Sequence, residues 1–594
     1  MSLFPGRRAY SDVSPTLGES IGQVVDGLRL FGLTSHPGRL LSMMAYALPR
    51  YGLSPAAAIM GPALTWGNRT ALIDDRGSMS YRQLGAAVGR LAAGLDRAGI
   101  GAGTRVGLMA DDDRYLLIVM GAVGLCGGTV WPVNPRLGSD DVRAWLDDNR
   151  IEVVIHADHC ASSLSGWVDS ARSSMSGDGA EDDDARPTGS KTPGLDGAGG
   201  SVGTSHSTRP TDLRGGLVTL SMTECDRLIA VSAGLPVPMR ARQSHFVLLT
   251  GGTTAVPSSI PITARWSAPV PILALAGSIK VRHGAPVLVC APCFHGYGLA
   301  VATLALVAGS PLVMSSVCRV EGLSAMNKGG TTGRLDWGEA IFTVVSHHQV
   351  ATIVGVPAQL RSLAAYLDQT NPPRTDEEQV VSIVSGSDRL EQATIDILQR
   401  RWGPVLVNYY GTTESGTVTM ISGSALQAHP GSLGRPVATT RIRILGRQGL
   451  VLPRGQIGRI QLLSPLASQG SRLVGDAFLT SDLGWVDADG YLYLKGRLGA
   501  GKAGGEFINP SRVESVLTSL DGIVWARAWL VPDQKYGQRV VAEVGLAGGC
   551  APDPEYWRQV VRTRLGPPSV PARITVRNCH PARSEAESQN PSLL

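Results

Sequence analysis

The sequence predicts an α/β fold, with a large N-terminal domain of α/β subdomains followed by a small α+β C-terminal domain. Short apolar strands alternate with longer amphipathic segments along most of the chain, which is typical of a sheet with helical connections. The 594 residues exceed what a single hydrophobic core usually serves. With 43% hydrophobic and 17% charged residues, the chain can bury a sizeable core.

Residues 1–60 are predicted to be an N-terminal extension, because helical patches alternate there with glycine and proline breaks. A helix packed on the main domain is the more common outcome for such a segment. Peripheral contact of its apolar and basic faces with a membrane stays open as the alternative. The two early arginines are not followed by an apolar run or a small-residue cleavage site, so we expect no secretory signal and a cytoplasmic location.

The main domain is predicted over residues 61–497, and the residue pattern indicates its first strands and helices. Ala71–Asp75 is a predicted strand, residues 76–100 contain a predicted helix, and Thr104–Asp113 begins with the next strand. A helix rich in small residues then leads to the strand within 127–135. This alternation resumes after an interruption and continues to about residue 494.

The interruption is predicted to be a disordered insertion at residues 161–216. It is rich in Ser, Gly, Asp and Pro and carries an acidic run at 181–184. Such a composition buries too little apolar surface to offset the entropy lost on ordering, so we assign it no chemistry. A shorter mixed unit at 498–594 is the predicted C-terminal domain.

Charge and cysteine content exclude several classes of partner. The net charge of +5 is small for this length and no block of Lys or Arg stands out, which argues against nucleic acid. The apolar stretches are too short to span a bilayer of about 30 Å, so we expect no transmembrane helix. Cys290 and Cys293 are spaced like metal ligands but lack a second ligand pair, so we interpret them as buried side chains.

The first segment with chemical character is the Gly/Thr-rich loop at 248–257, which follows an apolar strand. Such loops expose backbone N–H groups and hydroxyls, the donors that an anionic phosphate needs. An ordinary turn would have the same composition, so the loop by itself is a weak signal. The motifs that follow it along the chain decide between the two interpretations.

The loop resembles the phosphate-binding signature of the acyl-adenylate-forming superfamily, and later segments resemble that family's other motifs in the same order. The most specific match is Asn408–Glu414, which is similar to the family's Tyr-Gly-x-Thr-Glu motif. The resemblance points to the fatty-acyl-CoA synthetase branch and covers roughly residues 65–580 without the insertion. The other matching segments are 291–299, 354–357, 384–388, 481–484, 489–493 and 496–497.

The resemblance implies roles that fit the chemistry of each residue type. Tyr410 offers a flat face for adenine, Asp482 can accept hydrogen bonds from both ribose hydroxyls, and Glu414 is an oxygen ligand suited to Mg²⁺. An exposed loop or capping role is the alternative for Asp482 and Thr413. The implied catalytic residues are Thr253, His295, which borders the acyl pocket, and Glu414. The implied nucleotide and cofactor contacts are Thr250, Gly252, Thr254, Gly386, Tyr410, Gly411, Thr412, Thr413, Asp482, Arg497 and Lys502.

The family's reaction has two halves, and the resemblance implies ATP, Mg²⁺ and coenzyme A as its cofactors. A carboxylic acid, here a long-chain fatty acid, first attacks the α-phosphorus of ATP and releases pyrophosphate. Positioning and charge neutralisation supply most of the catalysis of such a step. A thiol then displaces AMP after the mobile C-terminal domain rotates.

Three motifs depart from the family pattern. Ser258 and Ser259 stand where the phosphate loop has Lys-Gly, and Leu498–Gly501 replaces the Lys-Asp pair of the domain hinge. The family's C-terminal lysine, which bridges the carboxylate and the α-phosphate, is also missing, since the last lysine of the chain is Lys535. Arg583 is an imperfect substitute because its fork differs in shape and reach. Losing one preorganised charge donor costs on the order of 10² to 10³ in rate.

Two classes of function therefore stay open from the sequence. The first is a working acid–thiol ligase in which another residue or a partner compensates for the lysine. The second is an impaired protein that binds nucleotide or acyl groups and serves in interaction or regulation. An enzyme that accepts preformed acyl-AMP is a third option.

Overall fold

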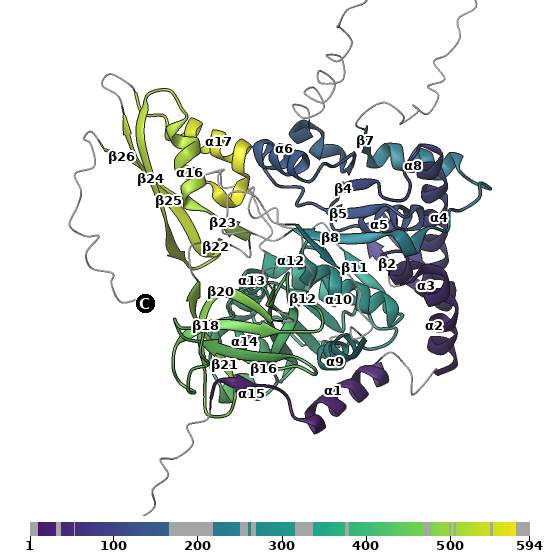
Figure 1. Ribbon diagram of the computed structural model, residues 1–594, viewed down its shortest axis with the longest axis horizontal. Helices are drawn as coiled ribbons and strands as arrows, with labels where there is room; N and C mark the ends of the chain where they lie inside the picture. The colour runs from purple at the N-terminus through teal and green to yellow at the C-terminus, as the bar shows by residue number, and fades with distance from the viewer. Residues whose placement is uncertain are drawn as a thin grey trace, which may run out of the picture.

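The computed structural model describes residues 10–30, 37–52, 54–164, 218–249, 259–262, 269–314, 337–374, 379–467, 473–474, 477–497, 501–503, 506–546 and 551–577. These residues form a large unit of two sheets with their helices and a smaller unit that begins at residue 501 (Figure 1). The α/β prediction is confirmed. The division of the chain into three domains stays a prediction.

The centre of the large unit is a parallel sheet whose strands are joined by helices. These strands are short, apolar and buried on both faces, as expected where helices cover a sheet on each side. Going along the sheet, the parallel strands follow the order β14, β13, β12, β10, β11 and β2, with β3 antiparallel at the edge. Their bounds are β2 Thr70–Asp74, β3 Gly77–Ser80, β10 Val287–Val289, β11 Leu312–Met314, β12 Thr352–Gly355, β13 Ser382–Ser385 and β14 Leu406–Thr412.

An antiparallel half continues this sheet beyond β14. It includes β1 from the N-terminal extension, which pairs with β17. The bounds are β1 Asp12–Val13, β15 Gly416–Ser422, β16 Ser432–Pro436, β17 Arg441–Leu445, β18 Gly458–Leu463, β19 Leu473–Val474, β20 Ala477–Val486 and β21 Leu492–Arg497. Of the predicted site residues, Thr413 and Glu414 lie in the turn between β14 and β15, whereas Asp482 lies within β20 and Arg497 ends β21.

A second sheet of six strands has the order β7, β6, β4, β5, β8 and β9 among the described residues. Its strands are parallel except for β9. The predicted strand in 104–113 is confirmed as β4. The bounds are β4 Arg105–Met109, β5 Thr129–Pro132, β6 Val153–His156, β7 Val218–Ser221, β8 His245–Leu249 and β9 Ser259–Ile262.

Helices of the large unit cover both sheets and lie between them. The helix predicted within 76–100 begins after Ser80, whose hydroxyl accepts a hydrogen bond from the backbone N–H of Gln83 in a capping box. It packs on two neighbouring helices, α3 and α5. The bounds are α2 Pro37–Tyr51, α3 Ala57–Trp66, α4 Tyr81–Arg97, α5 Arg114–Cys126, α6 Ser139–Asp148, α8 Met222–Val231, α10 Gly296–Val307, α12 Trp337–His347, α13 Pro357–Thr370, α14 Gln392–Trp402 and α15 Ala425–Ala428.

The N-terminal extension packs on the large unit, as Figure 1 shows for α1 (Leu17–Leu30) beside α9 (Pro269–Ile279). Glycines allow the two helices to approach closely, because a Cβ at Gly27 would lie 2.0 Å from the Leu273 carbonyl oxygen. Among the described residues, no helix combines the length and apolarity needed to cross a membrane. Peripheral membrane contact through residues 1–60 stays a prediction.

Most of the predicted insertion at 161–216 lies outside the described residues. Its first residues, 161–164, are described, and Leu164 is buried against the second sheet. The described part of the chain resumes at residue 218 with β7, a strand of the same sheet.

The smaller unit has its own sheets, and its Val513, Val540 and Val561 are fully buried. Figure 1 shows it beside α6 of the large unit. Its elements are β22 Gly501–Ala503, β23 Glu506–Ile508, α16 Pro510–Thr518, β24 Ile523–Asp533, β25 Gly537–Leu546, α17 Pro554–Leu565 and β26 Ile574–Arg577.

Candidate active site

Four parallel strands, β10, β12, β13 and β14, end at the same edge of the main sheet. The register places Gly355 beside Ser385, and Ser385 beside Asn408. In open α/β sheets, ligands bind beyond the carboxyl ends of the strands. The segments at or just beyond these ends are 291–295, 356–357, 386–388 and 410–414, and all of them belong to the motifs singled out in the sequence.

A hydrogen bond joins two of the predicted nucleotide contacts. The Tyr410 hydroxyl at the end of β14 donates to Oδ2 of Asp482 in β20, at 2.7 Å. Asp482 is 5% exposed, so its carboxylate depends on protein donors for its stability. Arg497 lies directly opposite Asp482 in the neighbouring strand β21, although its side chain is outside the description. Two residues distant in the sequence are thus fixed relative to each other.

Thr413 and Glu414 form the tip of the hairpin between β14 and β15. Reciprocal bonds close this turn, because the backbone N–H of Thr412 donates to the Ser415 hydroxyl at 3.1 Å and that of Ser415 donates to Oγ1 of Thr412 at 3.2 Å. Gly416 follows with φ +65°, a conformation that favours glycine. The Thr412 hydroxyl therefore serves the turn, whereas Thr413 and Glu414 are half-buried at its tip.

Glu414 is suited to hold a cation. Within the residues that the structure describes, its carboxylate makes no hydrogen bond or ion pair. A half-buried carboxylate without a protein partner keeps its oxygens available to a hard divalent ion. This observation fits the predicted role of Glu414 in binding Mg²⁺.

Two predicted glycines are required by packing. A Cβ at Gly386 would lie 2.9 Å from the ring of Tyr409, and a Cβ at Gly411 would lie 2.0 Å from the Gly416 carbonyl oxygen. The Tyr409 ring in turn meets the ring of Tyr297 edge-on at 4.9 Å. The absence of a side chain at Gly386 thus lets this aromatic pair fill the space beneath the strand ends.

Tyr297 ties neighbouring strand ends together. Its hydroxyl donates to the Val384 carbonyl at 2.7 Å and to the Gly355 carbonyl at 3.1 Å. Burial of its hydroxyl raises the pKa of Tyr297 well above its usual value. The hydroxyl therefore stays protonated and remains a donor at physiological pH.

His295 immediately precedes α10, and its imidazole lies near the C-terminal unit. Its Nε2 lies 3.6 Å from Oε1 of Glu506 in β23, and the two side chains are 34% and 16% exposed. Nε2 is buried without a hydrogen-bond partner in the described part of the chain. Glu506 was not predicted as a site residue. The signal for it was weak, since the sequence shows only that a Gly-Gly-Glu run follows the altered hinge.

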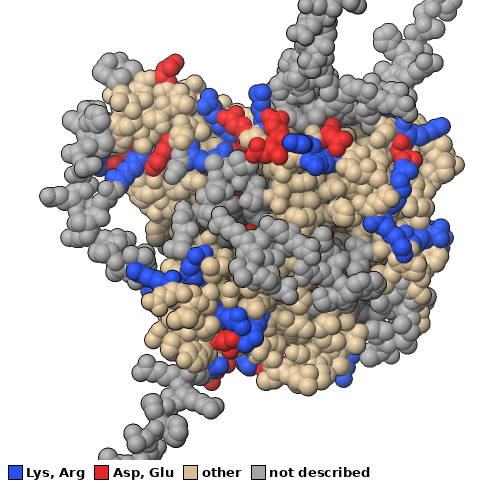
Figure 2. All heavy atoms as spheres, viewed as in Figure 1, with Lys and Arg blue, Asp and Glu red and all other residues tan. Residues whose placement is uncertain are grey.

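The smaller unit is held beside the site by contacts to α6. The guanidinium of Arg512 in α16 pairs with the carboxylate of Asp141, which is 6% exposed. Arg564 in α17 lies 3.7 Å from the carboxylate of Asp140, and the Ser139 hydroxyl donates to the Thr563 carbonyl at 3.4 Å. Figure 2 shows acidic and basic atoms together where α6 meets the smaller unit.

Close backbone approach reinforces this interface. A Cβ at Gly138 would lie 2.2 Å from the backbone of Arg564. Burial lowers the pKa of Arg512, against the opposing attraction of Asp140, so its guanidinium is partly desolvated where it meets the acidic helix start. The orientation of the smaller unit is therefore fixed by specific contacts, and this orientation brings Glu506 to His295.

Several predicted residues fall outside the described part. Thr250, Gly252, Thr253 and Thr254 all lie in the loop 250–258, which is not described. The backbone of Lys502 is described and pairs with Phe507 in the hairpin of β22 and β23, but its side chain is not. The roles of these residues stay predictions.

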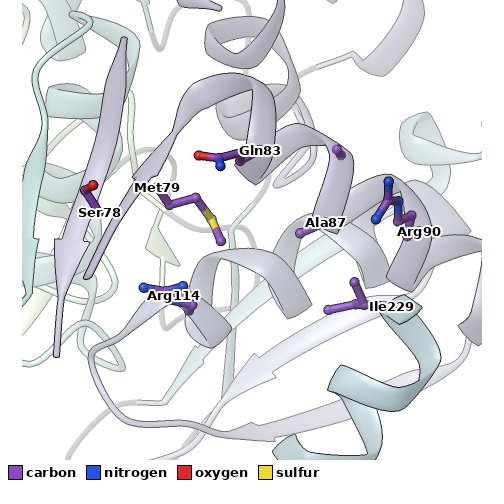
Figure 3. Close-up of a pocket in the computed structure, with 8 residues that line it drawn as sticks. Ser78, Met79, Gln83, Ala87, Arg90, Arg114 and Ile229 are labelled. Carbon is purple, nitrogen blue, oxygen red and sulfur yellow. The ribbon is translucent and has the colours of Figure 1, made fainter. Parts of the chain in front are cut away.

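A separate cavity of about 310 Å³ lies at the edge of the large unit. Figure 3 shows its side chains, which come from β3, α4, α5 and α8. Arg114, which lines the cavity, has a structural role because it forms an ion pair with the buried carboxylate of Asp74. The cavity contains none of the predicted site residues, so we do not assign it to the reaction. It is lined by Ser78, Met79, Gln83, Ala86, Ala87, Arg90, Arg114 and Ile229.

Curated relatives of this chain include several ligases. The chain is 25% identical over 516 residues to the feruloyl-CoA synthase of Amycolatopsis sp, covering 84% of this chain and 89% of the relative. Over 478 residues it is 25% identical to the long-chain-fatty-acid–CoA ligase FadD13 of Mycobacterium tuberculosis, covering 78% and 83%.

Solved structures have the same fold. The amide bond synthetase McbA from Marinactinospora thermotolerans matches with a TM-score of 0.69 at 22% identity, covering 90% of this chain and 97% of that one. The o-succinylbenzoate CoA synthetase of Bacillus subtilis matches with a TM-score of 0.67 at 18% identity, covering 89% and 96%. A family model described as AMP-binding enzyme matches residues 62–470. The resemblance indicated by the motifs is thereby confirmed, and the chain belongs to the AMP-binding enzyme family.

Proposed function

We propose that the protein activates a carboxylic acid as its acyl adenylate and transfers the acyl group to coenzyme A. The observation that carries this proposal is the hydrogen bond between Tyr410 and Asp482 beside the hairpin that presents Thr413 and Glu414. One sheet edge thereby presents the aromatic face of Tyr410, the buried carboxylate of Asp482, and the hydroxyl and carboxylate of the hairpin tip. This set matches the needs of a nucleotide with its metal ion.

In the first half-reaction, the substrate carboxylate forms a bond to the α-phosphorus while the bond to the pyrophosphate oxygen breaks. Tyr410 and Asp482 would orient the nucleoside, and Thr413 would donate to the α-phosphate. Glu414 would hold Mg²⁺, which supplies positive charge against the phosphate oxygens. The protein contributes mainly by positioning the carboxylate and the nucleotide, because transfer at phosphorus requires no covalent bond to the protein.

In the second half-reaction, the thiol sulfur bonds to the acyl carbon as the bond to AMP breaks. The thiol proton passes to solvent as this bond forms, and AMP departs with the electron pair of the broken bond. The contact between His295 and Glu506 supports participation of the smaller unit at the acyl end of the site, because it brings a carboxylate of that unit to the histidine. We propose that the smaller unit keeps this orientation relative to the large unit during acyl transfer.

The proposed acid is a long-chain fatty acid. Support comes from two relatives, FadD8 and FadD13 of Mycobacterium tuberculosis, which are named as fatty-acid–CoA ligases. Other relatives are named for ferulate, 2-succinylbenzoate and oxalate, so an acid panel must include aromatic and short dicarboxylic acids.

A second candidate function is a nucleotide- or acyl-binding protein with impaired adenylation. One observation favours it, namely that no lysine follows Lys535, so the C-terminal tail carries none to bridge the carboxylate and the α-phosphate. Such a protein would bind ligands through the same sheet edge without making the adenylate at a useful rate. An enzyme that consumes preformed acyl-AMP would share this property.

ATP–pyrophosphate exchange separates these functions. We expect acid-dependent exchange that is at least 10²-fold weaker in Glu414→Gln, given what one charge-stabilising group contributes. Glu555→Gln is the matched control, because that glutamate is 75% exposed on α17. Nucleotide binding without exchange would favour the second candidate. The absence of both would overturn the ligase proposal, and failure to bind an acyl-adenylate analogue as well would overturn the second candidate.

A further inference from the structure

A histidine and two aspartates meet outside the candidate active site. The ligand atoms of His429, Asp487 and Asp489 all lie within 4.8 Å of one another. His429 lies between α15 and β16, whereas the aspartates belong to the turn between β20 and β21. Asp487 is five residues beyond Asp482, which corresponds to about 17 Å along an extended strand. We call these three residues the His429 cluster.

The imidazole of His429 is held in a defined orientation. Its ring stacks on that of Tyr491, with 3.6 Å between the centroids and 17° between the planes. Its backbone N–H donates to the Ala425 carbonyl at 2.9 Å, which fixes the residue at the end of α15. The histidine side chain is 20% exposed, so it contacts both the protein and the solvent. An imidazole fixed in this way loses little freedom when it binds a ligand.

Asp487 is also held by its surroundings. Its Oδ1 accepts the backbone N–H groups of Asp489 at 3.0 Å and Tyr491 at 2.8 Å. The Tyr493 hydroxyl donates to its Oδ2 at 3.1 Å. Hydrogen bonds that orient a carboxylate from behind are the usual support of metal ligands. The backbone of the turn thus supplies the hydrogen bonds to Oδ1, whereas Oδ2 faces the imidazole of His429.

The spacing between the ligand atoms fits a metal ion better than a direct bond. Nδ1 of His429 lies 3.3 Å from Oδ2 of Asp487. A charge-assisted hydrogen bond is shorter, at about 2.7–2.9 Å. Two ligands at about 2.0–2.1 Å from one ion are separated by about 3.3 Å when the ion is tetrahedral. Asp489 is exposed, and its side chain can turn to supply the third ligand.

We propose that the His429 cluster binds Zn²⁺ through the imidazole and the two carboxylates, with water completing the coordination. One nitrogen and two oxygen ligands suit this ion, which accepts mixed nitrogen and oxygen donors and usually takes four ligands in a tetrahedral arrangement. The bound ion would join the segment before β16 to the turn after β20. Its role is to clamp two paired strands, β16 and β21, at one end of the antiparallel half.

Titration of the full chain with Zn²⁺ alone tests this assignment by calorimetry, in the absence of nucleotide. We expect one site that is lost in both His429→Gln and Asp489→Asn, and weakened by about 10-fold in Tyr493→Phe, which removes an orienting bond. The matched control is His159→Gln. His159 lies 3.7 Å from Asp111 but belongs to no such three-residue group among the described residues, so its loss should leave the site intact.

The second readout is thermal unfolding. We expect Zn²⁺ to raise the melting temperature of the unsubstituted protein and of His159→Gln, but not that of His429→Gln. Asp489→Asn changes an exposed group and guards against a folding defect as the cause of lost binding. The proposal is overturned if the natural chain shows no site, or if the site persists in His429→Gln and Asp489→Asn. ATP–pyrophosphate exchange is measured separately, so failure here does not bear on the proposed ligase activity.

Discussion

Arg512 of the smaller unit forms an ion pair with Asp141 at the start of α6, and so joins two parts of the chain that are far apart in sequence. Asp141 is 6% exposed, whereas the carboxylates in many surface pairs of this protein are open to solvent. Acidic residues in the first turn of a helix are favourable by themselves. Here they also orient the C-terminal unit, which carries Glu506 to the candidate site.

Removal of this pair is expected to loosen the smaller unit. Arg512→Ala leaves the Asp141 carboxylate buried without its cation, which we expect to weaken docking by about 2–3 kcal/mol, less than for a fully buried pair. Small-angle scattering should show a more extended average shape. Arg577→Ala is the control, since Arg577 is 62% exposed and pairs with Glu543 of the neighbouring strand within the smaller unit. An unchanged scattering curve for Arg512→Ala would show that the pair does not hold the unit.

The bond between Tyr410 and Asp482 predicts a nucleotide-binding defect. Tyr410→Phe keeps the aromatic face but removes a donor from a buried carboxylate, which costs about 1–3 kcal/mol. We expect roughly tenfold weaker ATP binding by calorimetry and a small drop in the melting temperature. Tyr556→Phe, at a tyrosine that is 54% exposed, should change neither. ATP binding of natural strength in Tyr410→Phe would exclude a role for this bond.

Gly386 predicts a steric requirement beneath the strand ends. Gly386→Ala would push a Cβ to 2.9 Å from the Tyr409 ring, which is itself buried against Tyr297. Displacement of a packed ring costs about 1–3 kcal/mol, so we expect a lower melting temperature and weaker nucleotide binding. Gly496→Ala is the control because no atom lies within 4 Å of its added Cβ. Equal melting temperatures for the two variants would contradict the packing argument.

The buried pair of Asp74 and Arg114 predicts a pH-dependent stability difference. Burial raises the pKa of Asp74, but hydrogen bonds and charge from Arg114 outweigh it and lower the pKa below the usual value. Asp74 therefore stabilises the fold above its unfolded pKa of about 3.9, and this contribution is lost as pH falls through the folded pKa. In Arg114→Met the guanidinium is lost, and only the backbone N–H groups of residues 76 and 114 still oppose the burial effect, so the pKa of Asp74 rises.

Thermal unfolding measured from neutral to acidic pH checks this sign. At neutral pH, Arg114→Met is expected to be less stable by about 3–5 kcal/mol, because a buried charge is left unpaired. The deficit should narrow on acidification as Asp74 takes up a proton in the variant. Arg29→Met removes a pair whose side chains are 64% and 57% exposed, and should have little effect. If the loss of stability in Arg114→Met did not change with pH, altered packing and not the lost ion pair would explain it.

The sequence determined by itself the α/β class, the alternation of strands and helices, and the family through its ordered motifs. These depend on local properties, because hydrophobic period, turn residues and short motifs are all legible within a few neighbouring residues. The helix predicted within 76–100 and the strand predicted within 104–113 are examples, observed as α4 and β4. The phosphate loop was also predicted locally, although it lies outside the described residues.

The tertiary structure decided which of these residues meet. Nothing near Tyr410 in the sequence indicates that its hydroxyl binds Asp482, and nothing near His295 points to Glu506 or near Asp141 to Arg512. Such contacts depend on how whole strands and units pack, since the gain from burial and pairing is realised only after distant segments are brought together. The motifs therefore indicated the chemistry, whereas the register of the strands and the docking of the smaller unit placed it in space.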